Sequence, residues 1–300
     1  MIFFNKTIVA LLPLLPKSIV KIFSKKYVAG TTDNEALNVV EKLNQNNQLA
    51  TIDILGEHTQ NREESLDIVS NYINLLEKID TRKLNCNLSI KPSHIGSDIN
   101  YNMVFNNFKS ILERASQYNN FIRIDMESSK LTDTTIKLYN DLQAISSNIG
   151  IVFQAYLHRT ENDINNLNKY SNIRLCKGIY KESSDIAYQD YEEINENYLK
   201  LLELAFKKEI YVGIATHDKQ LIHSSMDLIN KLGINNNMFE FQYLYGVPMK
   251  DIIRIYHKKN FKARCYVPFG KEWYDYSIRR IKENPQIASY VIKNIFSKNI

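Results

Sequence analysis

Four residues near the C-terminus combine side-chain types and spacing that suit the binding of a small anion. Counted as i, i+3, i+4 and i+7 along one predicted helix, they are Tyr276, Arg279, Arg280 and Glu283. A helix places such positions on one face. Adjacent guanidinium groups repel each other unless an anion lies beside them, and their planar shape matches a carboxylate. The alternative is a solvated surface helix with an intrahelical Arg279–Glu283 pair, and the spacing alone leaves both open.

Polar side chains also follow eight short apolar runs along the chain. The residues at these run ends are Gly56-Glu57, Lys91-Pro92-Ser93, Asp125-Met126-Glu127, Gln154, Lys177-Gly178-Ile179, Thr216-His217, Gln242 and Tyr266. In a parallel barrel the carboxyl ends of the strands meet at one face, where barrel enzymes place their chemistry. The residues that precede the runs are mainly Asn, Ser and Lys, which are ordinary turn residues. This contrast favours a functional site at the carboxyl face.

The residue types at these ends indicate what such a face would bind. The cations Lys91, Arg174 and Lys177 accompany amides, hydroxyls and a histidine, and the sequence has no metal-ligand spacing of His, Cys or carboxylates. A cofactor with a flat ring and phosphates suits this combination. Lys177 could alternatively be the Schiff-base lysine of an aldolase-type barrel.

The segments that must hold these residues alternate between strand length and helix length. The strand-length runs are residues 50–55, 87–91, 121–125, 149–155, 173–177, 211–215, 239–242 and 264–267. Amphipathic helix patterns lie between them, at residues 63–78, 103–118, 133–145, 191–208, 220–232 and 249–258. This alternation predicts an α/β fold, a distorted (β/α)8 TIM barrel with a C-terminal helix capping the site and N-terminal helices packed outside. A doubly wound open sheet is the alternative, but the chain lacks a Gly-rich phosphate motif.

The chain is divided by this prediction into an N-terminal helical segment, residues 1–48, and a catalytic barrel, residues 49–300. The apolar stretch at residues 8–15 is too short to span a bilayer, and Pro13 interrupts it. We interpret residues 2–23 as helix packed on the barrel, with contact to a membrane surface as the alternative.

Composition places the chain among ordinary globular proteins, with 44% hydrophobic and 24% charged residues. The net charge is +5, but the basic residues are dispersed, which argues against a nucleic-acid-binding tail. Cys86, Cys176 and Cys265 are far apart in the sequence. Such spacing favours reduced thiols in a cytoplasmic protein over a disulfide framework.

Longer motifs make the chain resemble the proline dehydrogenases, which oxidise L-proline to 1-pyrroline-5-carboxylate. They follow the family's order and spacing over about residues 27–285 and include DILGE (53–57), SIKPS (89–93), RLCKGIY (174–180), FEFQYLYG (239–246), YVPFG (266–270) and YSIRRIKENP (276–285). The resemblance implies an FAD-dependent barrel enzyme that catalyses the first step of proline catabolism to glutamate. It also implies that a hydride passes from the ring carbon beside the proline nitrogen to flavin N5.

The resemblance gives each matched position an expected role. Asp125 and Arg174 correspond to the family's catalytic pair. The positions that hold the proline carboxylate or line its pocket are Lys91, Tyr266, Tyr276, Arg279 and Arg280. Glu57 corresponds to a gate carboxylate that can pair with the first arginine. The cofactor-binding positions are Met126, Gln154, Lys177, Gly178, Ile179, Thr216, His217, Gln242 and Glu283, so Lys177 no longer needs the Schiff-base interpretation.

The chain departs from the family pattern at two positions. Ile179 stands where the family usually has alanine, and Cys176 stands where valine is usual. Tyr266 favours proline, because relatives that prefer hydroxyproline tend to have a smaller residue there. The alternatives are a dehydrogenase of hydroxyproline or another cyclic amino acid, and a non-catalytic flavin-binding relative.

Partners and location are also implied by the resemblance. A membrane quinone is the implied electron acceptor, and a separate pyrroline-5-carboxylate dehydrogenase is the implied downstream enzyme. We therefore expect a cytoplasmic protein, with peripheral contact at the inner face of the membrane as the alternative. No nucleic acid and no metal is expected.

Overall fold

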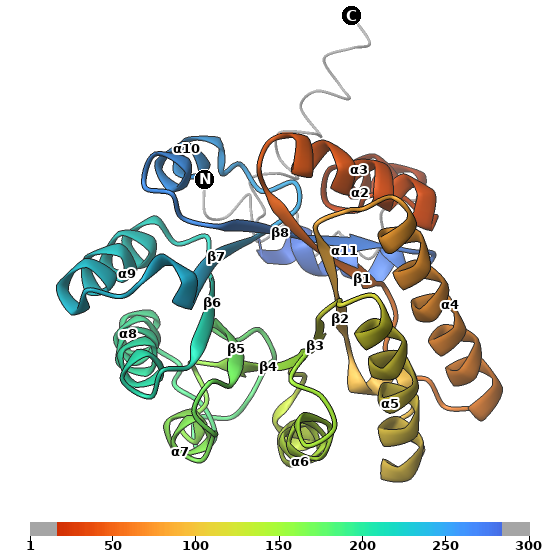
Figure 1. Cartoon of the computed structure of the whole chain (residues 1–300), viewed down its shortest axis with the longest axis horizontal. Coiled ribbons are helices and arrows are strands. Elements are labelled where there is room, and N and C mark those ends of the chain that lie inside the picture. The colour runs from red at the N-terminus through yellow and green to blue at the C-terminus, as the bar shows by residue number, and fades with distance from the viewer. Residues whose placement is uncertain (1–16, 284–300) are drawn as a thin grey trace, which may run out of the picture.

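The strands of the protein close into a barrel. The computed structural model describes residues 17–283, and within them eight parallel strands follow one another in chain order until the last pairs with the first. They are β1 (Leu49–Ile54), β2 (Cys86–Ile90), β3 (Ile122–Ile124), β4 (Ile149–Gln154), β5 (Asn172–Cys176), β6 (Tyr211–Ala215), β7 (Phe239–Leu244) and β8 (Ala263–Phe269). Figure 1 looks along the barrel and shows helices around the strands. The predicted (β/α)8 barrel is confirmed.

Helices connect the strands and flank the barrel at both ends of the described range. They are α2 (Lys17–Tyr27), α3 (Asp33–Gln45), α4 (Arg62–Thr81), α5 (Tyr101–Gln117), α6 (Thr132–Gln143), α7 (Thr160–Asn165), α8 (Tyr191–Lys207), α9 (Lys219–Leu232), α10 (Lys250–Lys258) and α11 (Trp273–Glu283), with short 3-10 turns at Pro92–Ile95, Ser129–Leu131 and Asn236–Met238. Side-chain oxygens that cap backbone N–H groups begin several of them. Thr32 and Glu35 form a capping box at α3, and Asp218 caps α9.

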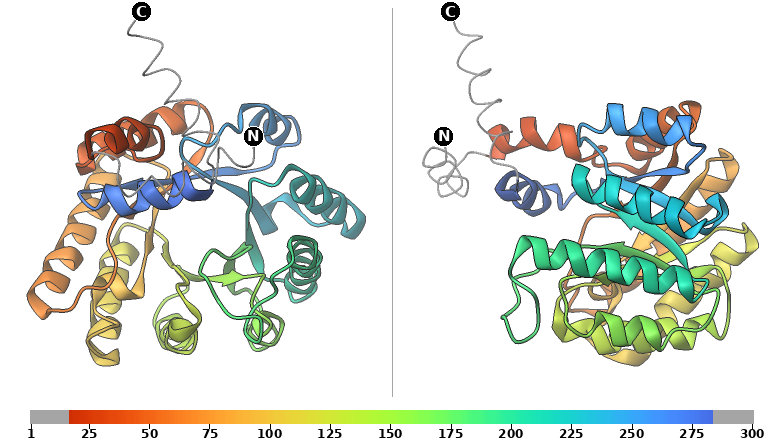
Figure 2. Two further views of the ribbon diagram at one scale, coloured as in Figure 1. Left: turned by 180° about the vertical axis from the view of Figure 1, so that it is seen from behind. Right: turned by 90° about the vertical axis from the view of Figure 1, so that its left-hand side faces the viewer.

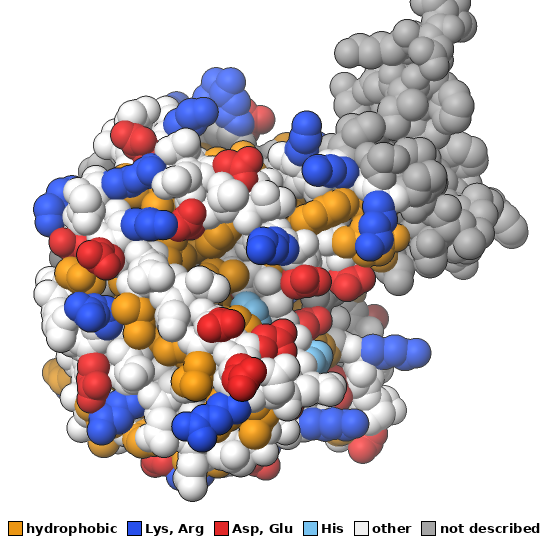
Figure 3. Space-filling model, turned by 90° about the vertical axis from the view of Figure 1, so that its right-hand side faces the viewer, with side chains coloured by type: hydrophobic (Ala, Val, Ile, Leu, Met, Phe, Trp, Pro, Cys, Tyr) orange, Lys and Arg blue, Asp and Glu red, His pale blue; other side chains and the backbone are white. Residues whose placement is uncertain are grey.

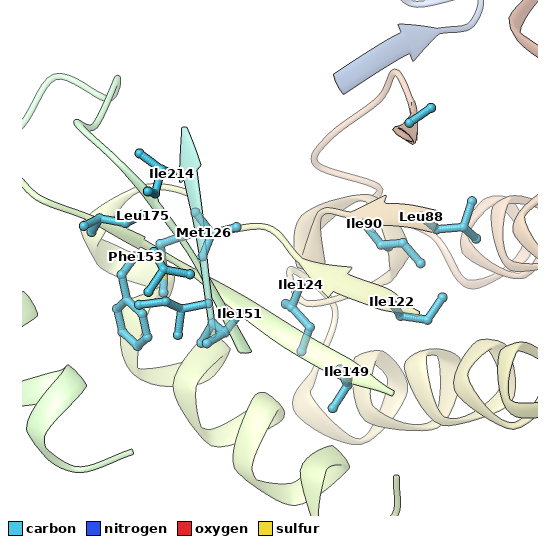
Figure 4. Packing of buried hydrophobic residues seen from close by; sticks show 14 of the residues in the cluster. Leu88, Ile90, Ile122, Ile124, Met126, Ile149, Ile151, Phe153, Leu175 and Ile214 are labelled. Atoms are coloured by element: carbon cyan, nitrogen blue, oxygen red, sulfur yellow. The ribbon is translucent and has the colours of Figure 1, made fainter. Parts of the chain in front are cut away.

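Alternation along the strands separates an apolar outside from a polar inside. Successive strand side chains point to opposite faces. The outward positions of β2, β3 and β4 are buried aliphatic residues that pack toward the helices, as Figure 4 shows for Leu88, Ile90, Ile122, Ile124, Ile149 and Ile151. The inward positions include Arg123, Arg174 and Glu240, all buried. A barrel interior is usually filled by Val, Ile and Leu, so this polar interior needs a reason other than packing.

The turns from helix to strand are alike around the barrel. Seven of them place a residue in the left-handed conformation, with φ between 49° and 66°: Asn47, Lys83, Asn119, Tyr170, Glu209, Gly233 and Asn260. Asn tolerates this conformation better than most residues, so its abundance before the strands has a local cause. The prediction of ordinary turn chemistry at this face is confirmed.

Helices α2 and α11 pack against each other, and α3 contacts β1 and β8. The described N-terminal helices, α2 and α3, therefore lie on the outside of the barrel, as predicted, whereas residues 1–16 of the predicted segment lie outside the described residues. Because α11 follows β8, it lies at the carboxyl end of the strands, and Figure 2 shows it at the same end as the loop between β5 and α8. Pro285, the last residue of the YSIRRIKENP motif, lies outside the described residues.

Two details of the structure differ from the predicted segments. Helix α7 has only six residues, too few for a helical period to be visible in the sequence. Strand β8 continues through Pro268 to Phe269, beyond the predicted end at residue 267. The Pro268 carbonyl accepts from Ala29 N at 2.9 Å, and the chain turns at Gly270, where φ is 136°.

Figure 3 shows acidic and basic side chains interspersed on one side of the molecule. Among residues 17–283, no helix is both long enough and apolar enough to cross a bilayer.

Candidate active site

Asp125, directly after β3, is the centre of a buried hydrogen-bond network. Its Oδ1 accepts from Ser89 Oγ at 2.5 Å and from Arg174 NH1 at 2.8 Å, and its Oδ2 accepts from Tyr266 OH at 2.9 Å. Asp125 and Arg174 are 9% and 7% exposed. Charge-assisted bonds of this kind are short and strong, and they fix the partners of the carboxylate in place. The structure therefore brings together the two residues predicted to be catalytic and the predicted pocket tyrosine.

Arg174 is also held from the opposite side. Its Nε donates to Gln242 Oε1 at 2.6 Å, and NH1 donates to Ser89 Oγ at 3.1 Å. The guanidinium carbon lies 5.1 Å from the centroid of the Tyr266 ring, a cation–π distance. Strands β2, β5, β7 and β8 thus all contribute to one fixed orientation of Arg174.

Lys91 follows β2 and forms an ion pair at the mouth of the barrel. Its Nζ donates to Asp53 Oδ2 at 2.8 Å, and the two side chains are 14% and 1% exposed. Burial alone would lower the pKa of Lys91, but the charges of Asp53 and Asp125 together raise it. Lys91 therefore stays protonated and can offer its remaining N–H donors to an anion.

The rim over β5 and β6 carries a second group of predicted residues. Lys177 Nζ donates to Asp218 Oδ2 at 2.7 Å and lies 4.0 Å from the centroid of the Tyr191 ring. Thr216 is buried, and its hydroxyl accepts from Asp218 N at 3.2 Å. Asp218 contacts both Lys177, which follows β5, and Thr216, which follows β6. It therefore links the ends of these two neighbouring strands.

His217 lies beside this rim as a neutral ring. Its Nε2 accepts from Leu244 N at 2.9 Å, so the ring carries its proton on Nδ1. Burial and the charge of Arg280 lower the pKa of His217 to about 4. The ring is therefore a hydrogen-bond donor at neutral pH without carrying charge.

Helix α11 supplies the arginine-rich face that the sequence singled out. Tyr276 and Arg280 are half-buried, with the Arg280 guanidinium carbon 5.3 Å from the Tyr276 ring centroid. The side chains of Arg279 and Glu283 lie outside what the structure describes, so the predicted Arg279–Glu57 gate stays a prediction. Glu57 itself is exposed, in the segment that follows β1.

The remaining predicted cofactor residues lie at the same end of the barrel. Met126 and Gln154 are buried, and Gln154 Nε2 donates to Glu127 O at 2.9 Å. Gly178 has φ of 119°, and a Cβ there would meet the Tyr156 ring at 2.1 Å. The next residue, Ile179, is 47% exposed, so its larger side chain does not crowd the described interior.

Several residues of the site were not predicted as functional. Asp53, Ser89, Glu240 and Asp218 each hold a predicted residue in place. The first three lie at inward positions of their strands. The signal available in the sequence was therefore a polar residue at every second position of an otherwise apolar run. Asp218 carries a different signal, because an aspartate before a helix is a common N-cap.

Comparisons with known proteins show what the chain is similar to. A family model described as proline dehydrogenase matches residues 36–293. Proline dehydrogenase 1 of Bacillus subtilis (strain 168) is 33% identical over 279 residues, covering 92% of this chain and 91% of that protein. Proline dehydrogenase of Deinococcus radiodurans is 30% identical over 278 residues, covering 91% of this chain and 89% of that protein.

A solved structure shares the fold. Proline utilization A from Bdellovibrio bacteriovorus, inactivated by N-propargylglycine, matches 87% of this chain with a TM-score of 0.81 at 23% identity. The match covers 32% of that longer protein, so this chain spans about a third of its length. The likeness supports the barrel architecture.

Proposed function

Because the chain belongs to the proline dehydrogenase family, we propose that it oxidises L-proline to 1-pyrroline-5-carboxylate with FAD as its cofactor. Oxidation of proline is the activity that this family membership supports. The single observation that carries the proposal beyond membership is the network at Asp125, which accepts hydrogen bonds from Ser89, Arg174 and Tyr266 at the carboxyl end of the barrel.

The donor groups at the barrel mouth fit a flavin dinucleotide. Lys177, Thr216 and the Nδ1–H of His217 lie at neighbouring strand ends, and ring oxygens and phosphates accept hydrogen bonds from such groups. Met126 and Gln154 add an apolar surface and an amide. When bound, the flavin supplies the two-electron acceptor, since no side chain of the chain can take up a hydride.

The cations above the polar interior suit a substrate carboxylate. Four cations and four carboxylates make up the described polar interior: Lys91, Arg123, Arg174 and Arg264 against Asp53, Asp125, Glu127 and Glu240. These charges balance in number. Arg280 and, as a further proposal, Arg279 add cations from α11 above it, and guanidinium groups suit a ligand carboxylate.

We assign the roles in catalysis as follows. Lys91, Arg279 and Arg280 orient the proline carboxylate, which fixes the ring in the pocket lined by Tyr266 and Tyr276. Proline gives up a hydride from its ring carbon and a proton from its nitrogen as the C=N bond forms. Asp125 already accepts three hydrogen bonds, so its role is to hold Arg174 and Tyr266 in position. Glu57 and Glu283 remain proposed as gate and cofactor contact.

Electron transfer out of the enzyme is proposed to use a membrane quinone. Lys17, Lys21 and Lys25 are exposed at i, i+4 and i+8 along α2, so one face of this helix is basic. Basic helix faces are attracted to anionic lipid surfaces. The product would then pass to a separate pyrroline-5-carboxylate dehydrogenase.

Product analysis tests the proposed reaction. The purified protein, supplied with FAD and a quinone in lipid vesicles, is incubated with L-proline, D-proline or 4-hydroxyproline. The proposal expects L-proline to give a product that is two mass units lighter, corresponding to loss of two hydrogens. Turnover of 4-hydroxyproline with none of L-proline would assign the related substrate instead, and no turnover of any substrate would refute the activity.

A further inference from the structure

A chain of hydrogen bonds runs through the barrel interior beneath Arg174. Arg264 Nε donates to Glu240 Oε1 at 2.6 Å, and Gln242 Nε2 donates to the same oxygen at 2.7 Å. The other end of the Gln242 amide accepts from Arg174 Nε at 2.6 Å. Glu240 and Gln242 are 2% and 5% exposed, so water does not compete for these contacts. The chain joins the inner end of β8 to the site at Asp125.

The types of the partners fix which way the Gln242 amide points. A carboxylate only accepts hydrogen bonds and a guanidinium only donates them. With Glu240 on one side and Arg174 on the other, the NH2 group must face Glu240 and the carbonyl must face Arg174. Rotating the amide by 180° would set donor against donor and acceptor against acceptor. Leaving buried polar groups unpaired in this way is costly.

Space for this amide comes from a glycine in the neighbouring strand. Gly213 of β6 is paired in register with Glu240 of β7. A Cβ at Gly213 would lie 2.4 Å from Gln242 Nε2, closer than any real contact. A glycine inside a strand commonly marks such a close approach. The Gln242 amide is thus fixed by hydrogen bonds to Glu240 and Arg174 and by its close approach to Gly213.

We propose that Glu240 is a positioning residue for Arg174, acting through the amide of Gln242, with Gly213 providing the space. Glu240 touches neither Asp125 nor any proposed substrate position, so its effect on the reaction passes through Arg174. The inference rests on the proposed function, because it assigns Arg174 to the reacting site. It predicts that disturbing this chain lowers kcat while leaving the binding of the carboxylate unchanged.

Two changes reach the Gln242 amide by different routes. Gly213→Ala pushes on Nε2 and leaves every charge in place. Glu240→Leu combined with Arg264→Met removes the Glu240 carboxylate together with the guanidinium that pairs with it. Neither charge is then left buried and unpaired. Each change is made in the native chain and in a Gln242→Ala background. Thr51→Val is the matched control, since it removes a buried barrel hydroxyl that bonds Asn87 and has no link to Arg174.

Kinetics and ligand binding are measured on the FAD-loaded protein. We expect each change to lower kcat about tenfold with native Gln242 and less than twofold in the Gln242→Ala background. The Kd of cyclopentanecarboxylate, a proline analogue without the nitrogen, is expected to stay within twofold. The cations proposed to bind the substrate carboxylate are not part of this chain of hydrogen bonds. Thr51→Val should leave both quantities within twofold. Equal losses of kcat in both backgrounds, or a parallel loss of ligand binding, would overturn the inference.

A double-mutant cycle, measured by thermal unfolding, separates this inference from the proposed function. It uses the same variants without substrate, so it does not depend on turnover. Gly213→Ala should lower Tm with native Gln242 and have little effect once the side chain is truncated. If the unaltered protein does not oxidise L-proline, the proposed function fails, and the unfolding cycle still tests the contact. Tm losses that are equal in the two backgrounds would overturn the contact itself.

Discussion

The buried Lys91–Asp53 pair can be tested with the variant Lys91→Met. Lys91 Nζ donates to Asp53 Oδ2 at 2.8 Å, and the Asp53 side chain is only 1% exposed. Methionine keeps most of the length of the side chain but removes the charge, so Asp53 loses its ammonium partner. Removing one partner of a buried ion pair costs about 3–5 kcal/mol of the free energy of unfolding. We expect a loss in this range at pH 8.

The size of the loss should depend on pH. Burial already raises the pKa of Asp53, and Lys91 opposes that rise. Without Lys91 the folded-state pKa rises further, so the folded protein retains a proton that the unfolded chain releases. Stability then falls as pH rises from the unfolded to the folded pKa, by up to about 1.4 kcal/mol per pH unit. The deficit of the variant should therefore shrink by up to about 3 kcal/mol between pH 8 and pH 6.

Urea unfolding followed by far-UV circular dichroism at pH 6 and pH 8 measures this difference. A deficit that is equal at the two pH values would refute the reasoning, because it would mean that Asp53 does not change its protonation. The double variant Lys91→Met/Asp53→Asn removes both charges and should recover most of the lost stability. A double variant as unstable as the single one would assign the loss to packing.

Lys177→Met is the matched control for this experiment. Its Nζ lies 2.7 Å from Asp218 Oδ2, but the side chains are 23% and 11% exposed. Asp218 also keeps its contacts with Tyr191 and with the backbone of α9. We expect a loss of about 1 kcal/mol, because charged hydrogen bonds near solvent contribute modestly. The loss should not change between pH 6 and pH 8.

Three further predictions follow from the site. Asp125→Asn removes the charge that Arg174 and Tyr266 contact at 2.8 and 2.9 Å, so kcat should fall about ten- to a hundredfold in stopped-flow reduction by proline; an unchanged kcat would contradict its role. Burial and the charge of Lys91 lower the pKa of His94 to about 3. Below pH 6.5 the unfolded chain gains a proton that the folded protein excludes, so stability falls toward pH 5 by about 2 kcal/mol, and His94→Gln should flatten that fall in urea titrations. If the substitution leaves the dependence of stability on pH unchanged, a group other than His94 takes up the proton. Ile179→Ala removes a side chain that is 47% exposed, and its Tm should change by less than about 1 °C, whereas a larger drop in thermal scans would show that Ile179 packs against the interior.

The barrel could be predicted from the sequence because each strand has its own local signal. Apolar outward positions such as Ile122 and Ile124 recur with a period of two, and helix-length patterns separate the runs. Helix α7 gave no such signal, since six residues hold fewer than two turns. The end of β8 was misjudged because proline usually ends a strand. The missing N–H of Pro268 is tolerated, and its carbonyl accepts from Ala29.

Partners across the barrel could not be predicted in the same way. Ser89 and Arg174 are 85 residues apart in sequence, and Tyr266 and Asp125 are 141 apart, yet each pair is hydrogen-bonded. Such contacts depend on the register of strands that are not neighbours in the chain, which no local pattern encodes. The resemblance to a family named Asp125 and Arg174, but the anchoring role of Glu240 required the structure.

An absorption spectrum of the FAD-loaded protein, recorded without oxygen before and after addition of L-proline, tests the central claim most directly. We predict a flavin spectrum that bleaches with L-proline and not with D-proline, because only the first places its reacting carbon correctly once the carboxylate is held. Bleaching would establish cofactor, substrate and electron transfer together. A bound flavin that does not bleach, or a protein that does not retain FAD after reconstitution, would contradict the proposal.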